Sequence, residues 1–495
     1  MADLFRNFIN GAWVESESGK TYERHNPATG ELVATYTSSI AKDVQTAVDA
    51  AKKAFESWRL FPAPKRGEIL YRVGQIMMDR KEQFAREMTE EMGKVINEAR
   101  GDVQEAIDMA FYMAGEGRRL YGQTTPSELP NKWNMSVRKP IGVAGIVTPW
   151  NFPMAIPSWK IFPAIVSGNT VVFKPASMTA RSAVRFVEIL TEAGVPEGVV
   201  NLVIGGGGEV GNAIIEHPHI PLISFTGSTE TGINVATKAA RLNKRVSLEM
   251  GGKNAVIVMD DANLDLATDG ILWSAFGTSG QRCTAASRVI AHRSVQKQLV
   301  EQLVERARSM KLGDGLDESV DVGPVVSDAQ LKSINSYVAI GTDEGARLAI
   351  GGAIVSNGDL SRGHFHQPTI FDNATASMRV AQEEIFGPVT TVVPVDSLDE
   401  AISVVNGVQY GLSASIFTAD VNTAFRAMQD VFTGILYVNA GTTGAEIHLP
   451  FGGTKGTGNG HREAGTATLD FFTEWQSIYV DYSGKLQRAQ IDPVS

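Results

Sequence analysis

The sequence predicts a protein of the α/β class with two lobes, and three observations support this prediction. Its 495 residues exceed what a single hydrophobic core usually holds together. Short apolar runs alternate with stretches of helical periodicity through both halves of the chain. Strands that alternate with helices favour a parallel sheet that is covered on both faces. We therefore expect two α/β lobes that meet near residue 250.

The N-terminal quarter is expected to be mainly helical. Helical periodicity runs over 42–58 and continues over 64–92 and 97–119. In the first of these segments the apolar residues that share one face are Val44, Ala47, Val48, Ala51, Phe55 and Trp58. A strand-rich segment at 137–147 follows, and the chain then begins its regular alternation.

That alternation sets the remaining expected elements. Strands are expected at 170–174, 199–204, 221–225, 254–259, 287–292, 365–371, 389–395, 414–418 and 434–438. Helices are expected at 181–194, 209–216, 229–241, 264–276, 294–310, 328–344, 397–406 and 421–430. The segment 468–482 alternates apolar and polar residues, which predicts a terminal strand with an edge free to pair.

Composition and charge narrow the class of protein. Hydrophobic residues make up 43% and charged residues 20%, as in ordinary globular proteins. A net charge of -10 argues against nucleic acid as the main partner. No apolar run reaches the ~18 residues of a membrane helix, and no basic-then-apolar leader begins the chain, so we expect neither a membrane partner nor a signal peptide. One cysteine excludes an internal disulfide and fits a reducing cytoplasm.

The single cysteine, Cys283, is a candidate nucleophile. Free cysteines are usually buried and act as small hydrophobic side chains, which is the plainer interpretation. Glycines at 277 and 280 let the backbone approach a ligand closely, and Arg282 would favour a thiolate. Both interpretations stay open on this segment alone.

Two further polar residues stand at the ends of expected strands. Glu249 precedes a Gly-Gly pair, where it is either a salt-bridged loop carboxylate or a base that activates water. Asn151 lies between Pro149 and Pro153, where its amide either stabilises a turn or forms part of an oxyanion site.

Two glycine-rich segments each follow a strand and open a helix. They are Gly205–Gly208 and the stretch from Phe225 to Gly232. Backbone N–H groups and a helix N-terminus bind phosphate at such places, although neither segment matches G-x-G-x-x-G.

Taken together, these segments resemble the aldehyde dehydrogenase superfamily. The matching blocks, in chain order, are Asn26-Pro-Ala-Thr-Gly30, Pro149-Trp-Asn-Phe-Pro153, Lys174-Pro-Ala-Ser177, Phe225-Thr-Gly-Ser228, Leu248-Glu-Met-Gly-Gly252, Gly280-Gln-Arg-Cys283, Glu383-Glu-Ile-Phe-Gly-Pro388 and Pro450-Phe-Gly-Gly453-x-Lys455. Eight collinear blocks cover nearly the whole chain. In style the chain is most similar to bacterial semialdehyde dehydrogenases of the 2-oxoglutarate semialdehyde (2,5-dioxopentanoate) type.

The resemblance implies a role for each matching residue. Cys283 would be the nucleophile, Glu249 the general base, and Asn151 would complete the oxyanion hole with the Cys283 N–H. The residues expected to bind NAD or NADP are Trp150, Lys174, Ser177, Gly207, Gly211, Gly227, Ser228, Glu384 and Phe386. The residues expected on the substrate side are Phe152, Ile156, Trp159, Arg282, Thr284, His448 and Phe451. No metal is expected.

The resemblance also implies a domain organisation. A variant Rossmann dinucleotide-binding domain would comprise 1–122 and 141–250, and an α/β catalytic domain would comprise 251–467. A small β arm for oligomerisation would comprise 123–140 and 468–495, which implies a homodimer or homotetramer.

The expected reaction is NAD(P)⁺-dependent oxidation of an aldehyde to an acid through a Cys283 thioester that Glu249 helps water to hydrolyse. A substrate with a carboxylate is favoured because Arg282 could pair with it, although Arg282 could equally have a structural partner. The alternatives are a broad-specificity aliphatic or aromatic aldehyde dehydrogenase, a CoA-acylating relative and a non-catalytic relative. Ser177 stands where NAD-preferring members commonly have glutamate, so the resemblance leaves NADP⁺ open.

Overall fold

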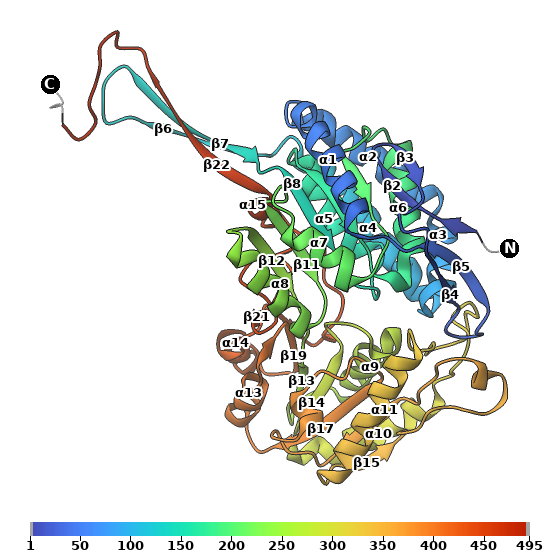
Figure 1. Ribbon diagram of the computed structural model, residues 1–495. Coiled ribbons are helices and arrows are strands. Elements are labelled where there is room, and N and C mark those ends of the chain that lie inside the picture. Colours follow the sequence, from blue (N-terminus) through green and yellow to red (C-terminus); the bar gives the residue numbers. More distant parts are fainter. Residues whose placement is uncertain (1–2, 492–495) are drawn as a thin grey trace.

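Two seven-stranded sheets form the two lobes of the molecule, which a computed structural model describes over residues 3–491 (Figure 1). The first has the order β12-β11-β8-β9-β10-β2-β3 and the second the order β15-β16-β17-β14-β13-β19-β20. The strands of the first are β2 (Asn7–Ile9), β3 (Ala12–Val14), β8 (Val143–Val147), β9 (Thr170–Lys174), β10 (Val200–Leu202), β11 (Leu222–Thr226) and β12 (Arg245–Glu249). Those of the second are β13 (Asn254–Val258), β14 (Ala286–His292), β15 (Arg347–Ile350), β16 (Thr369–Asp372), β17 (Val389–Val395), β19 (Ser413–Phe417) and β20 (Ile435–Val438).

Strands β8 to β12 pair in parallel, as do all strands of the second sheet except β15. This confirms the predicted α/β class. Because the carboxyl ends of parallel strands meet at one edge, the loops after β8, β9, β11 and β12 gather there.

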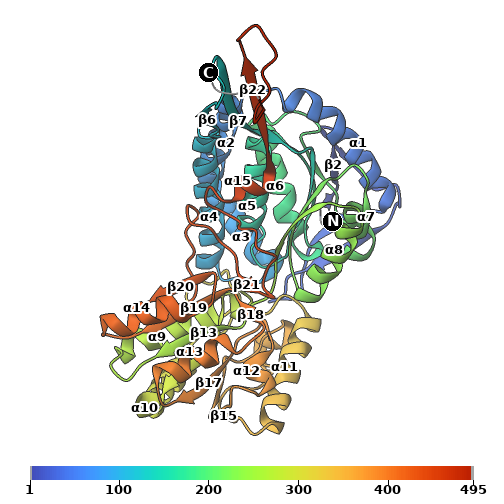
Figure 2. The ribbon, with the colours of Figure 1, turned by 90° about the vertical axis from the view of Figure 1, so that its left-hand side faces the viewer.

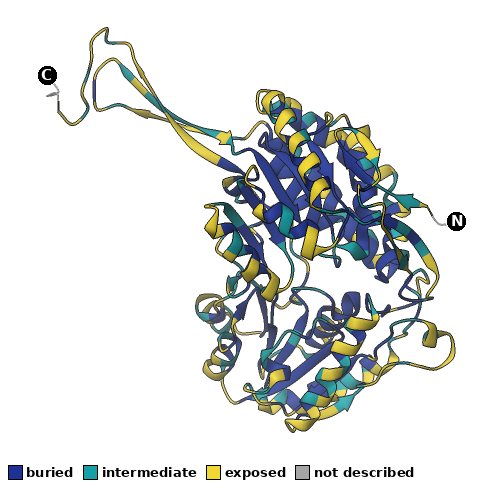
Figure 3. Ribbon diagram, in the orientation of Figure 1, coloured by how far each residue is buried: buried dark blue, intermediate teal, exposed yellow. Residues whose placement is uncertain are grey.

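Helices cover both faces of both sheets, which accounts for the nearly continuous burial of the central strands (Figure 3). In the first lobe they are α1 (Ala41–Trp58), α2 (Ala63–Asp79), α3 (Lys81–Met92), α4 (Ile96–Glu116), α5 (Ala155–Val166), α6 (Ala180–Glu192), α7 (Asn212–Glu216) and α8 (Thr229–Arg241). In the second they are α9 (Leu264–Phe276), α10 (Arg293–Ser309), α11 (Asp328–Asp343), α12 (Arg379–Gln382), α13 (Leu398–Asn406) and α14 (Val421–Asp430). Apolar residues of α2 to α6 pack on one face of the first sheet, and those of α1, α7 and α8 pack on the other. No described helix has the length and apolar character that crossing a membrane requires.

A narrow three-stranded antiparallel sheet projects from the first lobe (Figures 1 and 2). It consists of β6 (Gln123–Pro126), β7 (Lys132–Pro140) and β22 (Thr473–Asp481). The predicted terminal strand over 468–482 is wrong at its start, where residues form the helix α15 (Thr468–Phe472). Leu469, Phe471 and Phe472 are all buried in the core of the first lobe, so the apolar positions follow a helix there. Residues 492–495 of the predicted arm, and residues 1–2 of the predicted dinucleotide-binding domain, lie outside the described residues.

Several short strands were not predicted. They are β1 (Leu4–Phe5), β4 (Thr21–His25), β5 (Leu32–Thr37), β18 (Tyr410–Gly411) and β21 (Thr454–Lys455), together with β2, β3, β12 and β15. Most of them are edge strands with exposed or half-buried side chains, so they lack the apolar run that marks an inner strand. The helical segment 64–92 is also interrupted, because Arg80 separates α2 from α3 with φ −113° and ψ 14°.

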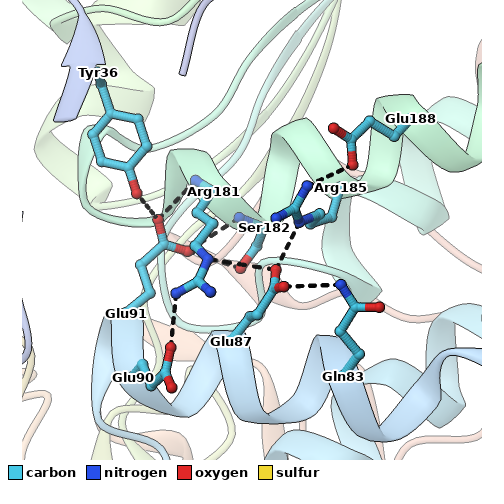
Figure 4. Close-up of polar contacts among 9 residues, drawn as sticks. All are labelled: Tyr36, Gln83, Glu87, Glu90, Glu91, Arg181, Ser182, Arg185 and Glu188. Carbon is cyan, nitrogen blue, oxygen red and sulfur yellow. Dashed lines mark hydrogen bonds and ion pairs between the residues drawn. The ribbon is translucent and has the colours of Figure 1, made fainter. Parts of the chain in front are cut away.

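A buried carboxylate fixes the start of α6, beside the loop that follows β9 (Figure 4). The Tyr36 hydroxyl and the Arg181 N–H donate to Glu91 Oε1 at 2.6 and 2.7 Å, and the Ser182 N–H and hydroxyl donate to Oε2 at 3.1 and 2.9 Å. Glu91 therefore occupies the N-terminus of α6 that could otherwise attract an anion. The short 3₁₀ turn Ser177–Thr179, which leads into α6, is held in place as a result.

Candidate active site

A cavity of about 250 Å³ lies where the two lobes meet. Its walls come from α4, α5, the ends of β11 and β12, the loop after α9 and the segment before Phe451. Eight predicted site residues line it, namely Phe152, Ile156, Trp159, Glu249, Arg282, Cys283, Thr284 and Phe451. Residues more than 300 positions apart in the sequence thus form one site.

The loop that carries Cys283 begins with three residues in the left-handed backbone conformation. Thr278 and Ser279 have φ of 51° and 55°, and Gly280 has φ of 69°. A Cβ atom on Gly280 would lie 2.0 Å from the Gly387 carbonyl oxygen, so only glycine fits there. The loop is secured beyond the nucleophile as well, because Asn254 Nδ2 donates to the Cys283 carbonyl at 2.7 Å.

The surroundings of Cys283 favour the neutral thiol. Burial above all, together with the nearby carboxylates of Glu249 and Glu384, raises the pKa of its thiol to about 12. Arg282, expected from the sequence to favour the thiolate, pairs through its guanidinium with Glu98 at 3.2 Å. Forming the thiolate therefore requires a base close to the sulfur.

Glu249 is the last residue of β12 and is 3% exposed. Neither of its carboxylate oxygens has a hydrogen-bond partner among the described residues. Burial raises its pKa well above the ordinary value, and Glu463 adds to the effect while Lys160 and Arg462 oppose it. A buried carboxyl with a raised pKa and free oxygens is suited to exchange protons with a thiol or with water.

The neighbours of Glu249 include a buried ion pair that sequence analysis did not find. Lys160 on α5 forms this pair with Glu463, and its Nζ also donates to Ser224 Oγ at 2.9 Å. A signal was present, because Lys160 stands among apolar residues throughout α5, and a buried lysine needs a partner. Its partner could not be identified, because Glu463 lies 303 residues later.

Asn151 lies in the loop between β8 and α5 and is 3% exposed. Its Nδ2 donates to the Gln281 carbonyl at 3.1 Å, so the Asn151 loop and the Cys283 loop touch directly. One amide N–H remains for a ligand, and Oδ1 has no partner among the described residues. Asn151 does not itself line the cavity that contains Cys283.

Aromatic rings form most of the apolar wall of the cavity. The rings of Trp159 and Phe451 meet edge to face with centroids 4.7 Å apart. The Arg282 guanidinium lies 5.6 Å from the Phe152 ring and 5.1 Å from the Trp273 ring. These contacts and the pair with Glu98 hold the Arg282 side chain in one position on the wall.

His448 does not line this cavity. Its side chain is 53% exposed, and its Nε2 lies 3.4 Å from Glu446 Oε2. It lies in an adjoining surface depression that shares Gly101, Glu105 and Ala445 with the main cavity. The predicted contact between His448 and a substrate thus has no support in this arrangement.

The predicted cofactor residues lie at the carboxyl edge of the first sheet. Lys174 ends β9, and burial lowers the pKa of its amine to about 8. The Ser177 hydroxyl donates to the Gly205 carbonyl at 3.2 Å. Ser228 caps α8, because its side chain accepts from the Thr231 N–H. Gly227 precedes this helix, whose N-terminus has the polarity that binds phosphate.

The shape of this edge fits a dinucleotide. A Cβ atom on Gly206, Gly207 or Gly208 would meet no protein atom within 4 Å, so no contact within the chain requires glycine there. Gly207 and Gly208 begin the π-helical turn Gly207–Gly211, whose last residue lies beside the Lys174 side chain. Thr226 Oγ1 and Lys253 Nζ are buried without a partner among the described residues, which is consistent with partners supplied by a ligand.

Glu384 connects this edge to the nucleophile. Its Oε1 accepts from the Gly252 N–H at 2.9 Å, and burial raises its pKa to about 7. A Cβ atom on Gly251 would lie 2.2 Å from Glu384 Oε2, which explains the glycine. Nearby, the rings of Trp150 and Phe386 meet edge to face at 5.4 Å between centroids. The predicted ribose and nicotinamide residues are therefore neighbours of one another and of Cys283.

Comparison with known proteins decides the family. The model of the aldehyde dehydrogenase family matches residues 13–478. The chain belongs to the aldehyde dehydrogenase family. The enzyme is 43% identical to the alpha-ketoglutaric semialdehyde dehydrogenase of Bacillus subtilis, over 97% of this chain and 98% of the relative. It is 44% identical to the alpha-ketoglutarate semialdehyde dehydrogenase of Haloferax volcanii, over 97% of this chain and 100% of the relative.

A solved structure agrees in fold along the whole length. The betaine aldehyde dehydrogenase of Staphylococcus aureus in complex with NAD⁺ superposes with a TM-score of 0.95 at 34% identity, covering 97% of this chain and 96% of that one. Together these findings confirm that the protein is an NAD(P)-dependent aldehyde dehydrogenase.

Proposed function

We propose that this aldehyde dehydrogenase oxidises a semialdehyde that carries a carboxylate, through a thioester on Cys283. The observation that carries the proposal is that Cys283 and Glu249 line one cavity, with the Asn151 amide on the loop that touches the Cys283 loop. The relatives named above, which act on alpha-ketoglutarate semialdehyde according to their names, support the substrate class.

The reaction begins with proton transfer from the Cys283 thiol. Glu249 accepts this proton, since its free carboxylate is one of the charges that act on Cys283. The thiolate attacks the carbonyl carbon, and the free N–H of Asn151 and the backbone N–H of Cys283 stabilise the negative charge that develops on oxygen. A nicotinamide held beside Cys283 by Glu384 and Phe386 would supply the acceptor for the hydride of this carbon.

In the second half of the reaction water hydrolyses the thioester. Glu249 first releases the proton of the thiol to solvent; it then takes a proton from the attacking water and returns it to the Cys283 sulfur as the carboxylic acid leaves. Lys160 and Glu463 form a buried ion pair beside Glu249, and their opposite charges act on the Glu249 pKa in opposite directions. The presence of Glu249 favours water as the acceptor, whereas a CoA-acylating enzyme needs no base for water.

The cofactor site accommodates NAD⁺ or NADP⁺. We assign the adenine ribose to Lys174 and Ser177, the pyrophosphate to Gly227, Ser228 and the turn of Gly207 and Gly211, and the nicotinamide ribose to Glu384, with Trp150 and Phe386 along the cleft. Ser177 is neutral and adds no charge that would repel a 2′-phosphate, and the Lys174 amine lies on the same loop. Acceptance of NADP⁺ is therefore part of the proposal.

The substrate carboxylate is assigned to Arg282. Its guanidinium lines the cavity and holds a fixed position between two rings, but one edge already pairs with Glu98. The remaining donors can bind a carboxylate only if the substrate approaches the free edge. A broad-specificity enzyme for neutral aldehydes is the alternative, and the aromatic wall of Trp159 and Phe451 favours it.

We also propose that the arm makes the enzyme a homodimer or homotetramer of the cytoplasm. Trp133, Trp475 and Tyr479 on the arm are 56%, 53% and 65% exposed, which is unusual for large apolar side chains in a monomer. Both outer strands of the arm, β22 and β6, have an unpaired edge, as has β20 in the second lobe. A thiol nucleophile also requires a reducing compartment.

A panel of aldehydes tests the substrate class. The kcat/KM values for semialdehydes with a carboxylate are expected to exceed those for neutral aldehydes of equal length by about tenfold or more, as one good charged contact provides. Arg282→Ala should raise KM for the carboxylated substrates more than for the neutral ones. Equal changes in both groups would assign Arg282 to structure, and CoA-dependent product would contradict the hydrolytic route.

A further inference from the structure

Helix α4 presents two buried carboxylates toward the active site. Glu98 and Asp102 are four residues apart, so they lie one above the other on the same face of the helix. Their side chains are 2% and 0% exposed, and both line the cavity that contains Cys283. Buried carboxylates need compensating partners, and here each one finds them on a different loop.

Glu98 binds the loop that carries the nucleophile. Its Oε2 accepts from the Thr278 N–H at 2.6 Å and from the Thr278 hydroxyl at 2.7 Å. Thr278 has φ of 51°, a conformation that a β-branched residue adopts only when its surroundings impose it. Arg282 completes the arrangement, since its Nη2 lies 3.2 Å from Glu98 and its Nε donates to Thr278 Oγ1 at 3.0 Å.

The glycine that precedes this loop is explained by the same contact. A Cβ atom on Gly277 would lie 2.9 Å from Glu98 Oε1. The sequence thus keeps position 277 free of a side chain so that the carboxylate of α4 can reach the Thr278 N–H. Cys283 follows five residues after Thr278, at the end of the segment that Glu98 holds.

Asp102 binds the other catalytic loop. Its Oδ1 accepts from the Ala155 N–H at 2.7 Å and from the Met154 N–H at 3.3 Å, at the N-terminus of α5. Asn151 lies three residues before Met154. The second oxygen of Asp102 pairs with the buried amine of Lys94 at 2.8 Å, and this amine lies 3.7 Å from the centre of the Phe152 ring.

We propose that Glu98 and Asp102 are positioning residues that set the distance between the Cys283 sulfur and the Asn151 amide by tying the two loops to successive turns of α4. The inference rests on the proposed roles of Cys283 and Asn151. A helical turn has a fixed rise of about 5.4 Å, so two carboxylates on successive turns hold the loops at a constant separation. A displacement of about 1 Å in such a site costs on the order of a hundredfold in rate.

The Asp102 part is tested by a pair of variants that remove the buried charges equally. Lys94→Met with Asp102→Asn keeps an oxygen that accepts from the Ala155 N–H, whereas Lys94→Met with Asp102→Leu removes it. We expect kcat of the first double variant to stay within about fivefold of wild type, and kcat of the second to fall about a hundredfold. The Kd for NAD⁺ should be similar in both, because neither double variant changes a residue that we assign to the cofactor.

The Glu98 part is tested through the thiol itself, because Cys283 is the only cysteine of the chain. Glu98→Gln keeps an acceptor for Thr278, and Glu98→Leu does not. The rate of alkylation by iodoacetamide, measured across pH, should shift about fivefold or more in Glu98→Leu and remain near wild type in Glu98→Gln. The Asp102→Leu double variant should alkylate at the wild-type rate, because its loop carries no thiol.

Two results would overturn the inference. Equal kcat in the Asn and Leu double variants would show that the Asp102 oxygen does not position the Asn151 loop. A parallel fall in kcat, NAD⁺ affinity and unfolding temperature in Glu98→Leu and the Leu double variant, with identical alkylation profiles, would assign both carboxylates to stability alone. Failure of the thioester mechanism is separate, because it would appear as activity that survives Cys283→Ala in the wild-type background.

Discussion

The two walls that meet at Cys283 are built by different means. On the substrate side, side chains hold one another: Arg282 pairs with Glu98 and lies against the Phe152 ring, and Trp159 meets Phe451. On the cofactor side, the backbone sets the shape through glycines, and polar groups such as Lys253 Nζ are buried without a partner among the described residues. The difference teaches that contacts between side chains hold the substrate wall in shape, whereas the backbone and its glycines shape the cofactor wall.

The comparison predicts that changes on each wall affect different measurable quantities. A change at the point where the walls meet should abolish the reaction. A change that affects one chemical step should separate the burst of NADH from the steady state in a stopped-flow trace. A change on the cofactor wall should alter only the preference between NAD⁺ and NADP⁺.

The largest effect is expected for Cys283→Ala. This variant removes the only thiol of the chain, so no group remains that can form the thioester. We expect dehydrogenase activity to fall below a few per cent of wild type, while the Kd for NAD⁺, measured by fluorescence titration, stays within about twofold. Normal NAD⁺ binding is the control for folding of the cofactor wall. Retention of a larger share of kcat would contradict the covalent route.

Glu249→Gln is expected to have the next largest effect. The amide keeps the shape of the side chain at the end of β12 but cannot take a proton from water. General-base catalysis contributes about 10²–10⁴-fold, so the steady-state rate should fall by about that factor. A stopped-flow trace should still show a burst of NADH close to one equivalent per active site, slower than in wild type because Glu249 also takes the proton of the Cys283 thiol, before a steady state that is slower still.

The control for Glu249→Gln is the same trace with wild type, in which burst and steady state should be less separated. If burst rate and steady-state rate fall together, Glu249 acts mainly on the Cys283 thiol rather than on the thioester. That result would make removal of the thiol proton the slow step of the variant, since burial and Glu249 both raise the pKa of Cys283.

The sequence singled out Asn151, Glu249 and Cys283 by a local signal, and the structure brings them together at one cavity and the loop that touches it. Asn151, Glu249 and Cys283 each stand at a strand end or in a glycine-rich loop, where a polar residue has no packing reason to occur. The alternating strands and helices of both lobes were likewise visible, because inner strands of a parallel sheet are continuous apolar runs.

The supports of the substrate wall could not be predicted, because their partners are distant in sequence. Glu98 and Asp102 have the spacing of an ordinary solvated helix face, and only the structure shows Thr278 and Ala155 against them. The ion pair of Lys160 was missed for the same reason, because its partner Glu463 comes 303 residues later in the sequence. For His448 the nearness to Phe451 in sequence was a poor guide to position, because its side chain lies in the adjoining depression and not in the cavity that contains Cys283.

The smallest effect is expected for Ser177→Glu, which changes the cofactor wall alone. The Ser177 side chain is half-buried, and its hydroxyl donates to the Gly205 carbonyl on the neighbouring glycine-rich turn. A carboxylate there would repel a 2′-phosphate and compete for the Lys174 amine, which burial already makes less basic, with a pKa of about 8. One like-charge contact of ~1.4 kcal/mol lowers kcat/KM for NADP⁺ by about tenfold. KM for the aldehyde should not change, because Ser177 does not line the cavity that contains Cys283. Ser177→Gln is the matched control, since it has the length of glutamate without the charge and should leave the NADP⁺/NAD⁺ ratio within about twofold of wild type. An equal loss of NADP⁺ activity in both variants would mean that size rather than charge excludes the phosphate. A wild-type enzyme without measurable NADP⁺ activity would refute the specificity argument and leave the division between the two walls intact.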